Sequence, residues 1–139
     1  MTDVAVEALE AKNTGVVLRY LRVFETREVA DLAELVDPDV VGHGAGQTVH
    51  GRRQVEDSVL SPGLSACVVR VDDLFAARDR VTVAFTLTYT RERTGEELVM
   101  TGHKSYRLRD GRIVELWGET DVFGFLRRAG VLPDELPPL

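Results

Sequence analysis

Two β-strands joined by a tight turn are predicted by Met100-Thr-Gly-His-Lys-Ser-Tyr-Arg-Leu-Arg-Asp-Gly-Arg-Ile-Val-Glu-Leu-Trp-Gly-Glu-Thr-Asp121. The turn is Asp110-Gly111, a pair that tolerates the positive φ angles of a two-residue hairpin loop. Because side chains alternate between the two faces of a strand, Lys104 and Tyr106 point inward and His103 points outward. A lysine in a protein interior is costly unless it is paired or used in chemistry. The hairpin therefore predicts both a sheet and a candidate functional residue.

Outward from this hairpin, the chain predicts helices first and an antiparallel meander afterwards. Turns at Arg78-Asp79 and Arg93-Thr-Gly95 separate the long strands. The four strands are predicted at residues 66–76, 80–92, 97–109 and 112–120, and the helices at 14–24, 27–36, 51–60 and 122–129. Gly42–Gln47 is predicted to form a short strand and a loop, while residues 1–12 and 133–139 form a lead-in and a tail. This order favours an α+β fold, with helices on one face of a curved sheet.

The alternation within the long strands predicts which residues face the helices. The inward set of the second long strand is apolar, whereas the opposite face is rich in threonine and suits a second sheet or a partner subunit. In the last strand, Leu116 and Gly118 are predicted to face inward, together with Val114. Ile113 and Trp117 are predicted to lie on the outer face, where an aromatic side chain suits a dimer interface.

Composition excludes several classes of function. The 139 residues carry a net charge of -6, which disfavours nucleic acid and anionic membranes as partners. A single cysteine, Cys67, excludes an internal disulfide, and the acidic N-terminus does not resemble a signal peptide, so we expect a cytoplasmic protein. The histidines and the cysteine lack metal-ligand spacing and no phosphate loop follows a strand, so we expect no metal and no cofactor.

Several local strings resemble the SnoaL-like polyketide cyclase and ketosteroid isomerase-like branch of the nuclear transport factor two-like superfamily. They are Val17-Leu-Arg-Tyr20, Leu35-Val-Asp-Pro-Asp-Val-Val41, Gly51-Arg-Arg, Asp72-Asp-Leu-Phe-Ala-Ala-Arg-Asp-Arg-Val81, Tyr106-Arg-Leu-Arg-Asp-Gly-Arg-Ile-Val-Glu-Leu-Trp-Gly118, and Asp121 leading into Gly124-Phe-Leu-Arg-Arg-Ala-Gly-Val-Leu132. The resemblance covers residues 14–132 and identifies residues 1–139 as a single SnoaL-like domain. It implies a conical α+β barrel with a deep apolar pocket, and a homodimer formed through the outer face of the sheet.

Members of this family include polyketide cyclases of secondary metabolism, isomerases, epoxide hydrolases, dehydratases and proteins that only bind ligands. Cyclases and epoxide hydrolases place a catalytic aspartate on the last strand, and the matching position here is Gly118. Ketosteroid isomerases use a phenol on the first helix, a base after the second helix and an acid on the penultimate strand. These positions match Tyr20, the segment around His43, and Lys104.

Four residues are therefore candidates for catalysis, each with a structural alternative. His43 can act as a general base, or it can be a loop histidine bonded to backbone. Lys104 can stabilise an enolate, hold an acidic substrate or form a Schiff base; alternatively its ammonium snorkels to the mouth or pairs with Asp73 or Asp39. Tyr20 can donate a hydrogen bond to the same oxygen, or simply fill the core. Asp73 can replace the carboxylate missing at Gly118 if its strand bulges.

The expected function is that of a cofactor-free cyclase, isomerase or dehydratase, that is, a lyase or isomerase. It would act on a polyketide-like or otherwise apolar carbonyl compound by proton abstraction and enolate stabilisation. The residues expected to contact the substrate are Phe85, Tyr89, Met100, Tyr106, Leu116 and His50. The alternatives are a non-catalytic small-molecule-binding domain of the same fold, an epoxide-hydrolase-like ring-forming enzyme, and a dimerisation module with a filled core.

Overall fold

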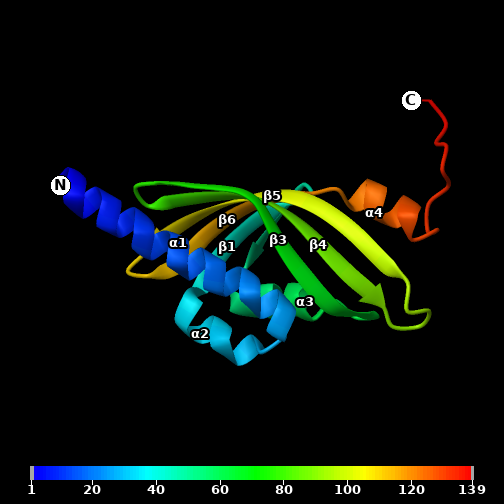
Figure 1. The fold of residues 1–139 in the computed structure, drawn as a ribbon, viewed down its shortest axis with the longest axis horizontal. Coiled ribbons are helices and arrows are strands. Elements are labelled where there is room, and N and C mark those ends of the chain that lie inside the picture. Colours follow the sequence, from blue (N-terminus) through cyan, green and yellow to red (C-terminus); the bar gives the residue numbers. More distant parts are fainter. Residues whose placement is uncertain (1, 139) are drawn as a thin grey trace.

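A computed structural model describes residues 2–138 of the chain as an α+β fold (Figure 1). Its elements in chain order are α1 Asp3–Thr26, the 3-10 turn η1 Val29–Asp31, α2 Leu32–Leu35, β1 Val36–Gly44, β2 Gln47–His50, α3 Arg52–Leu60, β3 Leu64–Ala77, β4 Arg80–Arg91, β5 Glu97–Arg109, β6 Arg112–Thr120 and α4 Val122–Arg128. The predicted fold class is confirmed, and the long strands begin and end within two residues of their predicted limits.

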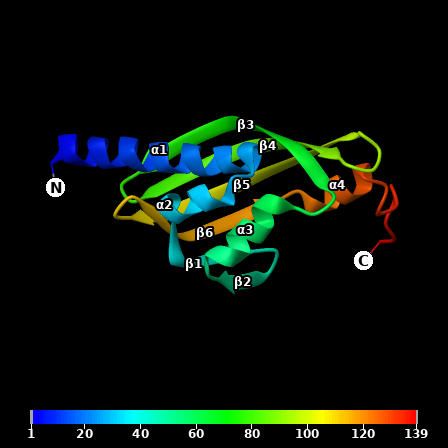
Figure 2. The same cartoon turned by 90° about the horizontal axis from the view of Figure 1, so that it is seen from below.

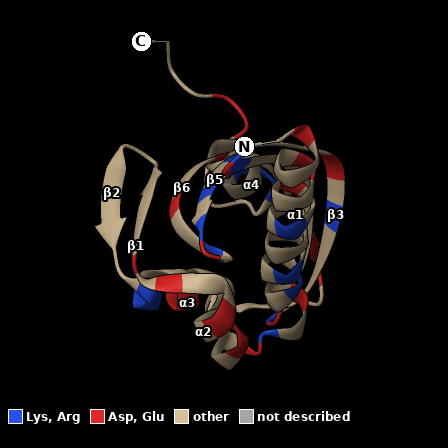
Figure 3. Cartoon of the chain, turned by 90° about the vertical axis from the view of Figure 1, so that its left-hand side faces the viewer, with Lys and Arg blue, Asp and Glu red and all other residues tan. Residues whose placement is uncertain are grey.

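The strands form one curved sheet in the order β2-β1-β6-β5-β4-β3. Strands β1 and β6 run parallel, and all other neighbouring strands are antiparallel. Seen from one end, the edges β2 and β3 lie on opposite sides of the view with the helices between them (Figure 3). Helix α3 lies beside the β1–β2 hairpin (Figure 2). The concave face of the sheet is therefore the covered face.

Helix α1 provides the main apolar cover of the sheet. Its inward stripe is buried and includes Val16, Val17, Tyr20, Leu21 and Phe24, as the helical spacing predicts. The helix also includes the segment predicted as a separate lead-in, and it begins at Asp3 because the Thr2 hydroxyl accepts a hydrogen bond from the Ala5 amide at 3.1 Å. Acidic and basic residues are interspersed along its exposed side, so α1 presents no face of a single charge (Figure 3).

The region between α1 and β1 was predicted to form one helix over residues 27–36, and the structure differs there. Arg27 has a left-handed φ of 61° and ends α1, and its guanidinium donates hydrogen bonds to the carbonyls of Leu60 and Leu64. Only short helical turns fit before Val36 enters β1. Pro38 lies inside this strand, where the pairing with β6 is interrupted between Val36 and Val41, so its missing N–H costs no ladder bond there.

A bulge in β6 corrects the predicted direction of Ile113. The register between β5 and β6 shifts after Arg107, so that Leu108 pairs with Ile113 while Arg107 pairs with Glu115. Val114 is the additional residue of this bulge, and Ile113 is 0% exposed instead of facing outward. From Glu115 onward the predicted alternation holds, which directs Leu116 and Gly118 inward.

No helix within residues 2–138 is both long and apolar enough to cross a membrane.

Candidate functional site

A pocket of about 310 Å³ lies between helices α1 and α3 and the concave face of the sheet. Its apolar wall includes Phe24, Val40, Val55, Phe85, Leu87, Met100 and Leu116. Among the described residues, the lining contains no aspartate or glutamate, and Lys104 is its only formally charged side chain. The alternative of a filled core is therefore wrong, and the pocket carries one uncompensated positive charge.

Strand pairing places Lys104 on the inner face of the sheet. It pairs with Val83 of β4 on one side and with Gly118 of β6 on the other. The ammonium nitrogen lies 5.5 Å from the ring centre of Phe24 and 5.9 Å from that of Phe85. These distances permit cation–π attraction, which only partly replaces the hydration that a half-buried ammonium loses.

Lys104 has no ion pair among the described residues. The alternative of a salt bridge to Asp73 or Asp39 is therefore wrong, and both of those side chains are exposed. Burial lowers the pKa of Lys104 from 10.5 to about 8, and it is the sole cause of the shift. At pH 7 the side chain is mostly an ammonium, with about a tenth present as the neutral amine.

Gly118 provides the space that the lysine occupies. A Cβ atom at position 118 would lie 3.0 Å from both Cγ and Cε of Lys104. The stem of Lys104 thus lies across the position at which the resemblance implies a catalytic aspartate.

Two phenols border the same pocket. Tyr20 comes from α1 and Tyr89 from β4, and both rings are buried. Burial raises the pKa of each phenol far above its usual range, so both remain protonated hydrogen-bond donors at neutral pH. Tyr106 was predicted to contact the substrate but lies outside the lining, packed edge-on against Tyr20 with ring centres 5.4 Å apart. Its hydroxyl is buried without a hydrogen-bond partner among the described residues.

His43 borders the pocket, but its ring is used on the opposite face of the sheet. Nε2 lies 2.7 Å from a carboxylate oxygen of Glu115, and Nδ1 lies 3.2 Å from the Thr48 hydroxyl. The ring stacks on Trp117, with centres 5.3 Å apart. Trp117 lies between Leu116 and Gly118 in β6, so alternation directs it away from Lys104. The expectation that His43 serves as a base inside the pocket is therefore corrected.

The outer network continues beyond His43. Arg107 donates to the second carboxylate oxygen of Glu115 at 3.0 Å, and the Arg80 guanidinium lies 4.7 Å from the centre of the Trp117 ring. Hydrogen bonds from His43, and then from Arg107, lower the pKa of Glu115. Each ionisable group in this network has a partner, which makes it a stabilising feature of the sheet surface.

Two other candidates also lie outside the pocket. Strand β3 does bulge between Val71 and Asp73, as the catalytic use of Asp73 required. Asp73 nevertheless pairs with Ala84 of β4. Because Ala84 lies between the inward-facing Val83 and Phe85, both it and Asp73 are on the outer face, and the Asp73 side chain is exposed. His50 ends β2 and is exposed.

The structure places four of the predicted contact residues on the pocket wall: Phe85, Tyr89, Met100 and Leu116. Sequence reasoning missed five other polar residues of the pocket wall, which are Gln47, Gln54, Ser58, Ser61 and Thr120. Gln54 and Ser58 lie four residues apart in α3 and flank the buried Val55 and Val59. Their helical spacing was the available signal, because it places them beside the inward stripe.

Comparison with known proteins identifies the family. The family model described as the SnoaL-like domain matches residues 17–116. No curated protein sequence matches the chain.

Several solved structures share the fold. One is AclR from Streptomyces galilaeus, a proposed hydroxylase, at 22% identity and a TM-score of 0.79 over 91% of this chain and 86% of that one. Another is IdmH from Streptomyces antibioticus, a proposed polyketide cyclase, at 23% identity and a TM-score of 0.75 over 86% and 99%. A third is an LEH-like epoxide hydrolase from M. tuberculosis, at 14% identity and a TM-score of 0.72 over 85% and 89%.

Proposed function

The chain belongs to the SnoaL-like domain family, and we propose that it is a cofactor-free enzyme acting on an apolar, polyketide-like carbonyl compound. The reaction is an enolate-type cyclisation, isomerisation or dehydration within the pocket. The single observation that supports this proposal is Lys104, a cation that has no ion pair among the described residues and lies in a pocket whose described lining has no acidic side chain.

Lys104 acts on the carbonyl group of the substrate. A positive charge beside the carbonyl oxygen favours the enolate over the ketone, because negative charge develops on that oxygen as the α-proton leaves. The phenols of Tyr20 and Tyr89 border the same space and can donate hydrogen bonds to the substrate. The apolar wall, which includes Phe85 and Leu116, limits the water that would otherwise screen these interactions.

The test is hydrogen exchange at the α-carbon of 2-tetralone, an apolar ketone, followed by NMR in deuterated buffer. Lys104→Met should reduce protein-catalysed exchange by about 100-fold, the size of effect expected for an essential polar group. Lys12→Met is the matched control, because Lys12 is exposed on α1 and outside the pocket. His43→Ala should leave exchange within about twofold of the original rate, since its ring lies on the outer face. Equal exchange by Lys104→Met and the parent protein would refute the proposal.

A non-catalytic binding domain is the second candidate, and one observation favours it. The family position for a catalytic aspartate is Gly118, and the lining of residues 2–138 offers no carboxylate in its place. The same lack of a carboxylate leaves no group to activate water as an epoxide hydrolase requires. In the binding-domain case, 2-tetralone would raise the melting temperature while its α-protons exchange at the rate found without protein.

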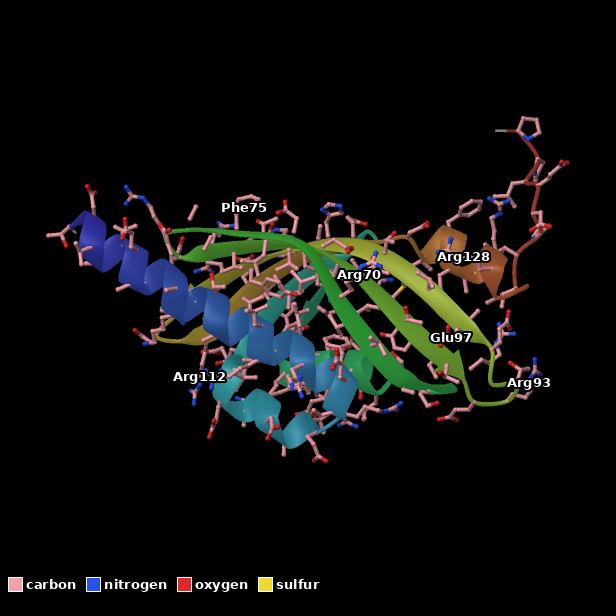
Figure 4. All side chains as sticks on the ribbon, viewed as in Figure 1. Arg70, Phe75, Arg93, Glu97, Arg112 and Arg128 are labelled. Atoms are coloured by element: carbon pink, nitrogen blue, oxygen red, sulfur yellow. The ribbon has the colours of Figure 1, made fainter. Side chains whose placement is uncertain are left out.

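We also propose that two copies of the chain associate through the outer face of the sheet. Supporting this, Val68 and Phe75 of β3 are 60% and 59% exposed, and Phe75 points out from the sheet (Figure 4). Exposed apolar residues grouped on one face favour burial against a partner. Phe75→Lys should shift the mass measured by light scattering from dimer to monomer, and an unchanged mass would contradict this interface.

A further inference from the structure

We propose that Lys104 is a covalent catalyst, whose nitrogen forms an imine with the carbonyl carbon of the bound compound. This inference rests on the proposed function and deepens it, because it specifies how the lysine acts on the carbonyl. It also defines the substrate class as aldehydes and ketones with an enolisable α-position, in preference to esters or epoxides.

The contacts of Lys104 are those of a nucleophile. Lysines that only stabilise a fold keep a carboxylate or water beside the ammonium, because an isolated buried charge is costly. Here the ammonium lies beside the rings of Phe24 and Phe85 and has no ion pair among the described residues. No carboxylate among residues 2–138 has to be displaced before the nitrogen attacks a ligand.

The stem of the lysine is positioned by the strand beside it. Cγ and Cε both lie at 3.0 Å from where a Cβ atom of residue 118 would be, so the chain of methylene groups follows the β6 backbone at Gly118. A lysine that lies against a strand has fewer rotamers to lose when it forms a bond than one that extends freely into solvent. Gly118 therefore contributes space and restraint together.

The surroundings also provide the reactive form of the nitrogen. Attack on a carbonyl requires the neutral amine, and the pKa of about 8 makes this form available near neutral pH.

The covalent step balances without a cofactor. The nitrogen lone pair forms a bond to the carbonyl carbon, and the π-electron pair moves to oxygen, which takes a proton from the nitrogen to give a carbinolamine. Loss of this hydroxyl as water, with one added proton, gives the iminium. Departure of the α-proton to water then gives an enamine. Reprotonation and hydrolysis return the amine of Lys104.

An iminium also accounts for a feature that charge stabilisation alone leaves unexplained. The described lining has no carboxylate to remove the α-proton, and the His43 ring lies on the outer face. A positively charged iminium acidifies the α-position much more than a hydrogen bond to a ketone does, so a weak base such as water is sufficient. The absence of a strong base is then consistent with catalysis.

The test is reductive trapping of the full-length protein with 4-phenylbutan-2-one, an apolar ketone, and sodium cyanoborohydride, followed by intact-mass and peptide mass spectrometry. We expect one secondary-amine adduct, located at Lys104. Lys104→Arg retains the positive charge but cannot form this imine, and should lose the adduct. Lys12→Met should retain it. Preincubation with 4-phenylbutan-2-ol, which has the same shape but no carbonyl, should reduce trapping by competition for the pocket.

The other outcomes separate this inference from the proposed function. An adduct distributed equally over Lys104, Lys12 and the N-terminus would refute selective imine formation. Ketone-induced thermal stabilisation and α-proton exchange without any adduct would refute the imine and leave the proposed function intact. Absence of adduct, stabilisation and exchange would refute both.

Discussion

The two faces of the curved sheet hold their ionisable side chains in different ways. On the outer face, the two ring nitrogens of His43 contact Thr48 and Glu115, and Arg107 pairs with the same carboxylate. On the inner face, Lys104 lies among aromatic rings with no ion pair among residues 2–138. Strand β6 separates the two environments, since Trp117 and Gly118 are consecutive residues that face opposite sides.

This difference indicates which residues stabilise the protein and which of them are available for chemistry. A paired group on a sheet surface lowers the free energy of the fold by a small amount. An unpaired charge in an apolar pocket raises it, and groups with pKa values shifted in this way cluster at functional sites. The inner lysine is therefore a better functional candidate than the outer histidine, although histidine is the more common catalytic residue.

The largest effect on stability is expected from a substitution that pushes apart β1 and β6, the neighbouring strands that contain His43 and Gly118. A Cβ atom at Gly44 would lie 2.5 Å from the backbone oxygen of Gly118, so Gly44→Ala requires a shift of β1 relative to β6. We expect this change to reduce the free energy of unfolding by about 3 kcal/mol, the upper part of the range for overpacking. Urea denaturation measures the loss.

Gly15→Ala is the matched control for this change. Apart from its own helix backbone and adjacent residues, a Cβ atom there meets no described atom within 4 Å, and position 15 lies inside helix α1, so alanine should stabilise the protein by about 0.5–1 kcal/mol. Equal effects of the two substitutions would mean that β1 and β6 are not as closely packed as the structure describes.

Removal of the inner charge should stabilise the protein. A lysine pKa lowered from 10.5 to about 8 corresponds to a penalty of about 3 kcal/mol below pH 8. Lys104 is half-buried, so solvent screens part of this penalty, and Lys104→Met should raise the free energy of unfolding at pH 7 by about 2 kcal/mol. A destabilised Lys104→Met protein would contradict the description of Lys104 as an uncompensated cation.

The pH dependence gives a second measurement of the same charge. Between about pH 8 and 10.5 the unfolded chain holds the lysine proton and the folded protein has lost it, so stability rises with pH in this window. The difference in unfolding free energy between Lys104→Met and the parent protein should therefore shrink as the pH rises. NMR titration of ¹³C-dimethylated lysines measures the pKa directly, with Lys12 as the second signal.

The sequence was sufficient to predict the four long strands and the inward direction of Lys104, because strand alternation and turn residues are local signals. It failed where long-range contacts decide the result. Ile113 faces inward because of a bulge set by pairing with β5, which no local pattern in β6 reveals. His43 was assigned to the pocket because its segment matched a catalytic position, but parallel pairing with β6 directs its ring toward Glu115. Residues on α3 were missed because the packing of that helix against β1, which brings it to the pocket, is a tertiary contact that no local pattern reveals.

On the outer face, removal of a charge should destabilise the protein, by less than removal of the Lys104 charge stabilises it. His43, and then Arg107, lower the pKa of Glu115 below its usual value of 4.5. The stabilisation that Glu115 gains from these hydrogen bonds is fully present above its unfolded-state pKa. It is lost as the pH falls through the lower folded-state pKa. Glu115→Gln should therefore reduce stability at pH 7 by less than the gain from Lys104→Met, and weaken the loss of stability below pH 4.5. An unchanged acid profile in urea denaturation would show that the outer network adds nothing measurable.

The smallest change in stability, with a clear effect on chemistry, is expected from Gly118→Ala. The added methyl group would lie at 3.0 Å from two atoms of the Lys104 stem, which is flexible and can move by a few tenths of an ångström. The free energy of unfolding should change by no more than about 1 kcal/mol, because the three atoms nearest to the methyl group all belong to the flexible Lys104 side chain. The nitrogen, however, would move from its position between Phe24 and Phe85, and productive attack on a carbonyl is sensitive to displacements of this size. Trapping of 4-phenylbutan-2-one should slow several-fold while the fold is retained. If trapping and the Lys104 pKa both remain unchanged, Gly118 only accommodates the lysine, and the position of the nitrogen is set by its own strand.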